Sequence, residues 1–315
     1  MLKLLILWCL ECLWCLSDLI IKPRMLSYKK GYLREVDSKK FDEQIYRKRA
    51  KQIFRIRSDY GYMIVGEYID GSYKNKVKSD IEEDKKVKSN EVNKNNKKIV
   101  ILCHGLGYAR YGSIKYIEMF LQLGFSVVIY DHRNHGQSGK AHTSMGFYEK
   151  YDLQRVVDWC YEQHGEDCTI VTHGESMGAA TVLLHLGIDN RVKCAIADCA
   201  YSDLRQLLRH QLKQYYHLPY FLISIESMLT YLRAGFWYQQ VSPIKVVSQT
   251  DIPILFIHGK VDNFVPATMS QQMYQAKKKN KALFLVAKAR HAESYCKNKE
   301  SYEKTVGEFL KTYLK

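Results

Sequence analysis

The chain has 315 residues, of which 46% are hydrophobic and 12% aromatic, so it can bury one large core or two modest ones, and a single main domain is the simplest interpretation. Lys and Arg exceed Asp and Glu by 15, and the excess is concentrated in residues 22–57, which hold thirteen basic and four acidic side chains. These basic residues adjoin an apolar run and match no recognised nucleic-acid-binding module, which argues against a nucleic-acid partner.

Residues 4–21 form a strongly apolar run that is interrupted only by Glu11, Ser17 and Asp18. The run predicts a membrane-associated helix within residues 1–24. Its length is at the lower limit for spanning a bilayer, and the two carboxylates share one helical face, where they would be costly in hydrocarbon. An amphipathic helix that lies in the membrane interface is therefore the alternative. No small-x-small cleavage site follows, which argues against a cleaved signal peptide.

Residues 25–53 are predicted to be a basic juxtamembrane segment. Because the positive charge lies mostly after the apolar run, the positive-inside tendency places the main domain on the cytoplasmic side. The nine cysteines are odd in number and scattered, so we expect free thiols. Three of them lie in the apolar run at a spacing that superficially resembles a metal site, and we interpret Cys9, Cys12 and Cys15 as packing residues instead.

Residues 54–315 are predicted to form the main domain. It begins with an antiparallel hairpin of residues 54–57 and 62–65. Residues 71–98 are rich in Lys, Asn, Ser, Asp and Glu and have no apolar period, which predicts a disordered insertion. Continuous apolar runs then alternate with helical stretches, as is typical of a mostly parallel sheet with helices on both faces. The six predicted strands after the hairpin are residues 99–103, 125–130, 169–173, 194–198, 253–258 and 282–287.

Helices are expected between these strands. Residues 149–164 show the clearest helical spacing, with Leu153, Val156, Val157 and Cys160 on one face. Residues 200–240 interrupt the alternation and are rich in Leu, Tyr and Phe, which predicts a helical cap over the strand ends.

Residues 174–178 have the sequence Gly-Glu-Ser-Met-Gly and lie between a β-branched run and a helix-like stretch. This is the G-x-S-x-G pattern of a nucleophile elbow, in which the glycines let backbones pass closely while the serine is held exposed and strained. A serine hydroxyl is a weak nucleophile unless an imidazole takes its proton and a carboxylate orients that imidazole. The pattern therefore predicts Ser176 as the nucleophile of a serine hydrolase.

The acid and the histidine follow in the order that this arrangement requires. Asp262 comes after the strand that ends at residue 259, and His291 comes after the strand that ends near residue 287. Asp198, at the end of another strand, is the alternative acid. The histidines that we expect to be structural are His104, His132, His135, His173 and His258.

The oxyanion of a tetrahedral intermediate needs two donors that already point at it, and backbone amides meet this need. Met177 offers an N–H at a helix N-terminus, directly after the nucleophile. Leu106, in the loop after the first parallel strand, is the second expected donor, and Gly107 is the alternative.

The motifs around His104–Gly107, residues 131–138, the Ser176 elbow, His258-Gly259 with Asp262, and residues 289–291 occur in the order found in α/β-hydrolases. The chain resembles the serine-aminopeptidase and monoglyceride-lipase-like branch of that superfamily over roughly residues 50–315. Residues 148–153, 174–180 and 232–236 are similar to bacterial membrane-tethered hydrolases of the YqkD type. Glu175 stands where many relatives have histidine, and Asn134 where many have glycine.

The resemblance implies an α/β-hydrolase fold with an eight-stranded, mostly parallel sheet and a helical cap. It also implies a triad of Ser176, Asp262 and His291, and an oxyanion hole formed by the backbone of Leu106 and Met177. We expect no cofactor and no metal.

The expected function is hydrolysis of carboxylic esters through an acyl-enzyme, with a small-molecule or lipid-like substrate that carries a hydrophobic acyl group. The alternatives are a peptidase or protein thioesterase of the same fold, or a membrane-tethered binding protein without turnover. We expect attachment to a membrane through the N-terminal segment and no nucleic-acid partner, while the oligomeric state is left open. A chain that starts near Tyr28 is expected to be soluble and active.

Overall fold

The computed structural model describes residues 2–38, 41–71 and 97–314, and within residues 2–12 it describes only the side chain of Glu11. Most of the predicted insertion at 71–98 lies outside these residues. The strand that follows it begins at Lys98.

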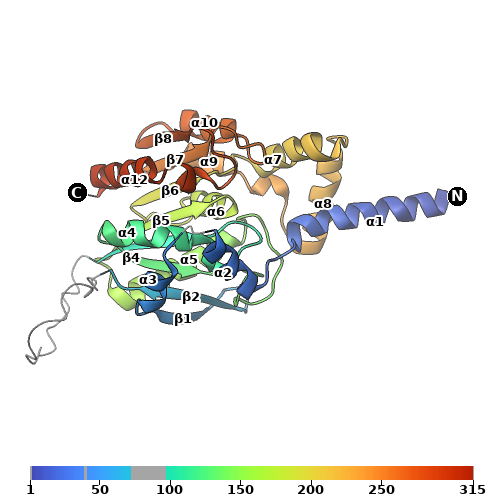
Figure 1. Cartoon of the computed structure of the whole chain (residues 1–315). Helices are drawn as coiled ribbons and strands as arrows, with labels where there is room; N and C mark the ends of the chain where they lie inside the picture. Colours follow the sequence, from blue (N-terminus) through green and yellow to red (C-terminus); the bar gives the residue numbers. More distant parts are fainter. Residues whose placement is uncertain (1, 39–40, 72–96, 315) are drawn as a thin grey trace, which may run out of the picture.

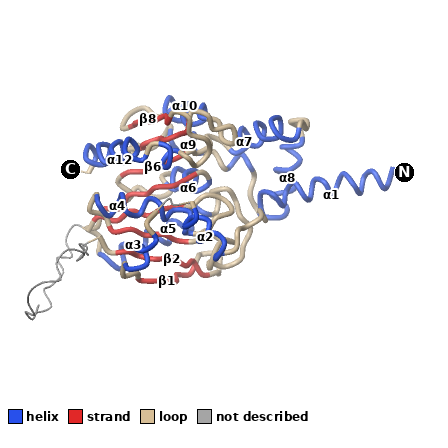
Figure 2. The backbone as a smooth tube through the Cα atoms, viewed as in Figure 1, coloured by secondary structure: helices blue, strands red, loops and turns tan. Residues whose placement is uncertain are grey.

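An eight-stranded sheet forms the centre of the molecule (Figures 1 and 2). Its strand order is β1-β2-β4-β3-β5-β6-β7-β8, and only the pairs β1–β2 and β2–β4 are antiparallel. The strands are β1 (Gln52–Arg57), β2 (Met63–Ile69), β3 (Lys98–Cys103), β4 (Ser126–Tyr130), β5 (Thr169–Glu175), β6 (Cys194–Asp198), β7 (Ile254–Gly259) and β8 (Lys281–Val286). The predicted hairpin and the six parallel strands are thus confirmed.

Helices cover both faces of the sheet because each central strand is apolar on both sides. In β3, Ile99 and Ile101 belong to one buried cluster, whereas Val100 and Leu102 belong to the other. The first cluster is completed by α5 (Glu149–His164), α6 (Met177–His185), α9 (Pro243–Val247) and α10 (Ala267–Ala276). The second is completed by the 3₁₀ helix η1 (Arg110–Tyr116), α4 (Ile117–Gln122), α11 (Ser294–Lys297) and α12 (Lys299–Tyr313).

The helical segment between β6 and β7 projects beside the sheet as the predicted cap (Figure 1). It has its own apolar cluster, which includes Leu204, Leu212, Ile223 and Phe236, and this cluster continues into the main domain through Met177. The cap consists of α7 (Leu204–Gln211), the π-helical turn η2 (Leu212–Tyr216), α8 (Leu222–Ala234) and the 3₁₀ turn η3 (Tyr238–Gln240).

The N-terminal segment contains three helices: α1 (Leu2–Ile21), α2 (Tyr28–Asp37) and α3 (Glu43–Lys48). Figure 1 shows that α1 points away from the sheet at its N-terminal end, while its C-terminal end lies against α8. None of the described helices combines the length and the apolar character that crossing a bilayer requires.

The basic segment that follows α1 packs on the main domain. α2 contacts η1. Arg49 forms a bidentate ion pair with Glu118 of α4, with N–O distances of 3.0 and 2.9 Å. Part of the positive charge predicted for a membrane-proximal tether is therefore used in contacts within the fold.

Candidate active site

The elbow lies where β5 ends at Glu175 and α6 begins at Met177. Ser176 adopts φ 56° and ψ −116°, a strained conformation for a residue with a side chain. The flanking glycines are required by close packing, because a Cβ on Gly174 would lie 2.3 Å from the backbone of Gly178. A Cβ on Gly178 would lie 2.1 Å from the carbonyl oxygen of Cys103. Tight packing of strand against helix thus holds the serine at the turn.

The imidazole of His291 lies between Ser176 and Asp262, within hydrogen-bonding distance of both. The Nε2 atom of His291 is 2.9 Å from Oγ of Ser176, and Nδ1 is 2.7 Å from Oδ2 of Asp262. The structure therefore brings together three side chains that are up to 115 positions apart in the chain. In this geometry the imidazole can accept the serine proton while the carboxylate fixes its tautomer.

The Asp262 carboxylate is buried and is held by four donors. Oδ1 accepts the backbone N–H groups of Phe264 and Val265, each at 2.9 Å, and Oδ2 lies 3.2 Å from Nε2 of His258 in addition to its bond with His291. Burial would raise the pKa of Asp262, but the hydrogen bonds from His258 and His291 outweigh it and keep that pKa well below its usual range. Asp262 is therefore ionised at neutral pH.

Asp198, the alternative acid, has other partners. Its Oδ1 accepts from Ser294 at 3.0 Å, Oδ2 lies 3.5 Å from the Tyr116 hydroxyl, and its backbone carbonyl accepts the N–H of Ser176 at 2.9 Å. Burial and the nearby charge of Glu175 raise the pKa of Asp198 to about 6. The described contacts thus connect Asp198 to the base of the elbow and connect His291 to Asp262.

The loop after β3 supplies the second expected oxyanion donor. Leu106 lines the same cavity as Ser176 and Met177. The N–H of Gly107, the alternative donor, already donates to Nε2 of His135 at 3.2 Å. Met177 is the first residue of α6, where N–H groups have no partner within the helix. Leu106 and Met177 thus stay the expected oxyanion donors, whereas the N–H of Gly107 has another partner.

The histidines expected to be structural are buried, and four of them bond to the fold through their rings. His104 accepts the backbone N–H of His132 at 3.0 Å, His173 lies 2.8 Å from the Tyr302 hydroxyl, and His258 contacts the Val265 carbonyl at 2.8 Å. His135 contacts the carbonyl of Arg133 at 2.7 Å. Both ring nitrogens of His132 are buried without a hydrogen-bond partner among the described residues.

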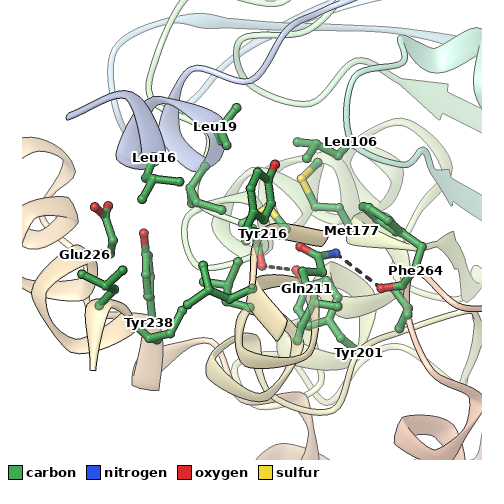
Figure 3. A pocket seen from close by; sticks show the side chains of 18 of the residues that line it. Leu16, Leu19, Leu106, Met177, Tyr201, Gln211, Tyr216, Glu226, Tyr238 and Phe264 are labelled. Carbon is green, nitrogen blue, oxygen red and sulfur yellow. Dashed lines mark hydrogen bonds between the residues drawn. The ribbon is translucent and has the colours of Figure 1, made fainter. Parts of the chain in front are cut away.

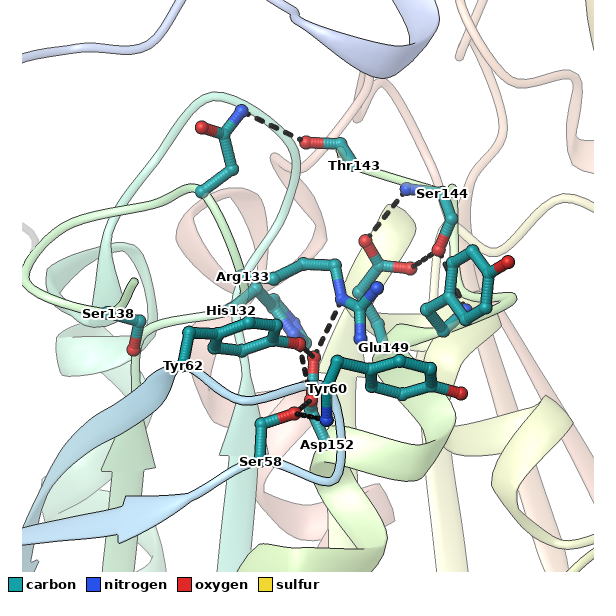
Figure 4. Close-up of polar contacts among 12 residues, drawn as sticks. Ser58, Tyr60, Tyr62, His132, Arg133, Ser138, Thr143, Ser144, Glu149 and Asp152 are labelled. Carbon is teal, nitrogen blue, oxygen red and sulfur yellow. Dashed lines mark hydrogen bonds and ion pairs between the residues drawn. The ribbon is translucent and has the colours of Figure 1, made fainter. Parts of the chain in front are cut away.

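Two buried carboxylates at the start of α5 organise the loops beside the site (Figure 4). Asp152 accepts hydrogen bonds from Ser58 at 2.7 Å, Tyr62 at 2.6 Å and Nε of Arg133 at 2.8 Å. Glu149 accepts the backbone N–H groups of Ser144 and Gly146 at 2.9 and 2.8 Å. The sequence predicts a helix here, but it gives no role to these two carboxylates. The structure shows that it fixes the loop that carries Met145, a residue of the cavity wall.

An apolar cavity of about 240 Å³ opens on Ser176 (Figure 3). The cap supplies about half of its wall, and the elbow supplies Met177. Figure 3 places Leu106, Met177 and Phe264 together at one end and Glu226 and Tyr238 at the other. Three further wall residues come from α1, namely Leu16, Leu19 and Ile20.

A second cavity, of about 370 Å³, is polar and is lined by His291, Glu175 and Lys115. Lys115 Nζ lies 2.5 Å from Glu175 Oε2, and the Tyr116 hydroxyl donates to the same oxygen at 2.6 Å. Burial would raise the pKa of Glu175, but the Lys115 ammonium outweighs it and lowers that pKa. The acidic residue that departs from the family pattern is thus neutralised by a buried lysine.

Glu226 is a buried carboxyl in the apolar cavity wall, and neither of its oxygens has a hydrogen-bond partner among the described residues. Burial raises its pKa from 4.5 to about 7, against an opposing effect of Arg233. The folded protein therefore binds this proton more tightly than the unfolded chain does. Its contribution to stability is complete below pH 4.5 and is lost as the pH rises through about 7.

Replacing Glu226 by glutamine is expected to reduce this loss. Between about pH 5 and about pH 8 the wild type should lose on the order of 2 kcal/mol more unfolding free energy than Glu226→Gln. Urea denaturation at both pH values measures the difference. Asp198 titrates in the same direction in both proteins, so it cancels in the comparison. Parallel pH profiles would show that the carboxyl is solvated in the native state.

Among the described residues, Cys199, Asp262 and His291 form a group whose potential metal-ligating atoms lie within 4.8 Å of one another. Asp262 and His291 are hydrogen-bonded to each other, and burial raises the pKa of the Cys199 thiol well above its ordinary value. A protonated thiol is a poor metal ligand, so this group is better suited to hydrogen bonding. Cys15, Cys103, Cys160, Cys168, Cys194 and Cys199 are free thiols, as predicted, and Cys9 and Cys12 lie outside the described side chains.

The fold and the elbow geometry are those of an α/β-hydrolase, and the chain belongs to this family. The family described as alpha/beta hydrolase fold matches residues 98–224. Among curated proteins, the chain is 42% identical over 214 residues to the uncharacterized protein YqkD of Bacillus subtilis, a match that covers 67% of this chain and 70% of YqkD. It is 24% identical over 224 residues to the uncharacterized protein YfhR of Escherichia coli K12, covering 69% and 72% of the two chains.

Solved structures with the same fold include esterases. The Pyrococcus furiosus esterase Pf2001 superposes with a TM-score of 0.68 at 21% identity, covering 94% of this chain and 98% of the esterase. Est1E from Butyrivibrio proteoclasticus, solved with ferulic acid bound, has a TM-score of 0.64 at 16% identity and covers 83% and 99% of the two chains. At these low sequence identities, the structural likeness shows that the chain shares the fold of these proteins, and it shows the fold alone.

Proposed function

We propose that the protein is a serine hydrolase that cleaves carboxylic esters with a hydrophobic acyl group through an acyl-enzyme. The observation that carries this proposal is the hydrogen-bonded chain from Ser176 through His291 to Asp262, next to an apolar cavity. The esterases among the structural neighbours support the same class of reaction.

The proposed reaction begins when Oγ of Ser176 attacks the ester carbonyl carbon and His291 takes the serine proton at Nε2. The carbonyl electron pair moves to oxygen, where the N–H groups of Leu106 and Met177 stabilise the negative charge. As this intermediate collapses, the bond to the alcohol oxygen breaks and His291 returns the proton to the alcohol. Water, deprotonated by His291, then attacks the acyl-enzyme and releases the acid and Ser176.

The two cavities suggest where the parts of the substrate bind. The leaving alcohol must lie within reach of Nε2 of His291, and the polar cavity is the one that His291 lines. The apolar cavity is lined by Ser176 and by aliphatic and aromatic side chains, which favours the acyl chain there. We therefore assign the apolar cavity as the acyl pocket.

Labelling with a fluorophosphonate probe tests the function. The wild type should be labelled at Ser176, and Ser176→Ala should not be labelled. A wild type that stays unlabelled while its fold is intact would favour the alternative of a binding protein without turnover. Parallel assays with aryl esters, an acyl thioester and aminoacyl anilides distinguish an esterase from a thioesterase or a peptidase.

We also propose that α1 and the cap bind a lipid surface, with α1 lying in the interface. The side chains of Trp14 and Leu19 on α1 and of Phe221 and Leu232 on the cap are more than half exposed. Exposed apolar side chains beside positive charge are typical of interfacial binding to anionic lipid, and the chain carries a net charge of +15.

Co-sedimentation with vesicles tests this proposal. The full chain should pellet with vesicles of phosphatidylserine and phosphatidylcholine more than with phosphatidylcholine alone. Phe221→Ser combined with Leu232→Ser should pellet less. Met63→Ser, which changes an exposed apolar residue on β2, is the matched control. A full chain that remains in the supernatant with every vesicle would contradict the proposal.

A further inference from the structure

The N-terminal helix contributes directly to the wall of the acyl pocket. Leu16, Leu19 and Ile20 line the same cavity as Ser176, and Figure 3 shows Leu16 and Leu19 at its edge. Ile21, the last residue of α1, is fully buried and joins the apolar cluster of the cap and Met177. A segment that the sequence separates from the main domain therefore forms one side of the site.

Polar contacts fix where α1 lies on the cap. Arg233 of α8 forms an ion pair with Asp18, donates to the Trp14 carbonyl at 3.1 Å, and stacks over the Trp14 ring at 3.7 Å. The Ser17 hydroxyl is buried and lies 3.5 Å from the hydroxyl of Thr230, which donates to Tyr238 at 2.8 Å. Because these bonds are directional, they set the rotation of the helix as well as its position.

The segment that leaves α1 is bonded to the two loops that build the site. The carbonyl of Ile21 accepts the N–H of Thr143 at 3.0 Å, in the loop that carries Met145. The N–H of Leu26 donates to the carbonyl of Gly107 at 3.0 Å, next to the expected oxyanion donor Leu106. The N-terminal segment is thus hydrogen-bonded to the main domain at Ile21 and again at Leu26.

We propose that α1 determines the acyl-chain length that the enzyme accepts, and that the substrates are esters of medium-chain acids. This inference rests on the proposed function, because it assigns the acyl chain to the cavity beside Ser176. Arg233 acts as a positioning residue that holds α1 in place. Leu16, Leu19 and Ile20 are the side chains that limit the chain.

The size of the cavity leads to the medium-chain class. Its volume of about 240 Å³ is small for a ligand pocket, which favours a short or medium acyl chain over a long one. Pockets for larger ligands begin near 300 Å³ and extend to about 1,000 Å³. A long fatty acyl chain would therefore require α1 to move away from the cap.

The test compares aryl butanoate, octanoate and dodecanoate as substrates of the full chain. The wild type should prefer octanoate. Ile20→Trp should lower kcat/KM for octanoate by at least about ten-fold more than it lowers kcat/KM for butanoate, since the added ring occupies the far part of the acyl position. Leu16→Ala should shift the preference toward dodecanoate. Cys15→Trp introduces the same side chain at an exposed position of α1 and is the matched control.

Arg233→Ala should release α1 and broaden the chain-length profile, through a change in KM for octanoate more than in kcat for butanoate. Arg233→Lys, which retains the charge, should restore part of the selectivity. Chain-length profiles that are the same in the wild type, Ile20→Trp, Leu16→Ala and Arg233→Ala would overturn the inference, even with every protein active on butanoate. Loss of all ester hydrolysis and of fluorophosphonate labelling in the wild type would instead overturn the proposed function.

Discussion

Ser176→Ala is expected to lower kcat for an aryl ester by on the order of a million-fold. The variant retains the cavity and the expected oxyanion donors but loses the atom that forms the acyl-enzyme. Residual hydrolysis above the rate in water would come from binding and from oxyanion stabilisation alone. Steady-state kinetics on aryl butanoate measure the effect.

The backbone at position 176 is strained, so the variant requires a check on folding. Alanine has the same Cβ and no bulk beyond it, and far-UV circular dichroism together with thermal unfolding should match the wild type closely. Ser248→Ala is a suitable control, because the Ser248 hydroxyl bonds only to the Lys245 carbonyl at the surface. Retention of more than about one per cent of the wild-type rate in Ser176→Ala would contradict its role as nucleophile.

Asp262→Asn is expected to lower kcat by about 10⁴-fold, as the equivalent change does in other serine triads. An amide at this position can present its N–H₂ group to His291 and favour the wrong tautomer of the imidazole. The site also loses the negative charge that stabilises the imidazolium. The bonds from Phe264 and Val265 to Oδ1 can persist, so the loop should keep its shape.

Asp198→Asn is the comparison that decides which acid serves His291. Its carboxyl bonds to Ser294 and lies near Tyr116, and its pKa is raised to about 6, so it is a weaker anion near neutral pH than Asp262. We expect less than about a ten-fold loss of kcat, because this change acts only on the packing below the elbow. The opposite ranking of the two variants would transfer the acid role to Asp198.

Much of the fold follows from local patterns in the sequence. The continuous apolar runs predicted the parallel strands to within one or two residues at most ends, because strands buried on both faces have no polar alternation. The segment 149–164 coincides with α5, since its amphipathic spacing is strong. The ends of strands were less certain: β5 continues to Glu175, into the residues that the pattern assigned to the elbow.

The sequence also predicts that Ser176, Asp262 and His291 lie close together. Each follows a parallel strand, and the carboxyl ends of parallel strands lie at one edge of the sheet. The choice between Leu106 and Gly107 as the oxyanion donor does not follow from the sequence. It depends on the bond between Gly107 and His135, whose residues lie 28 positions apart. The pairing of Glu175 with Lys115 likewise joins residues 60 positions apart, and no local pattern predicts it.

The N-terminal segment is where tertiary structure changes an expectation most. Composition alone separated residues 1–24 from the domain, so a chain starting near Tyr28 was expected to be soluble and active. However, α1 lines the cavity, Ile21 at its end bonds to Thr143, and Leu26 bonds to Gly107. We therefore expect a chain that starts near Tyr28 to have altered acyl selectivity even where it retains turnover. Attachment of this segment to a membrane and a cytoplasmic position of the domain remain predictions.

The sequence by itself determined the strands and the elbow, because each is encoded by residue types at short, fixed spacing, and it predicted Ser176, Asp262 and His291 as the reacting groups. Only the tertiary structure decided that Asp262 is the carboxylate bonded to His291, that the N–H of Gly107 is bonded to His135, and that α1 lines the apolar cavity beside Ser176. These depend on directional contacts between residues far apart in the chain, such as Arg233 with Asp18, and hydrophobic periodicity carries no information about such pairings.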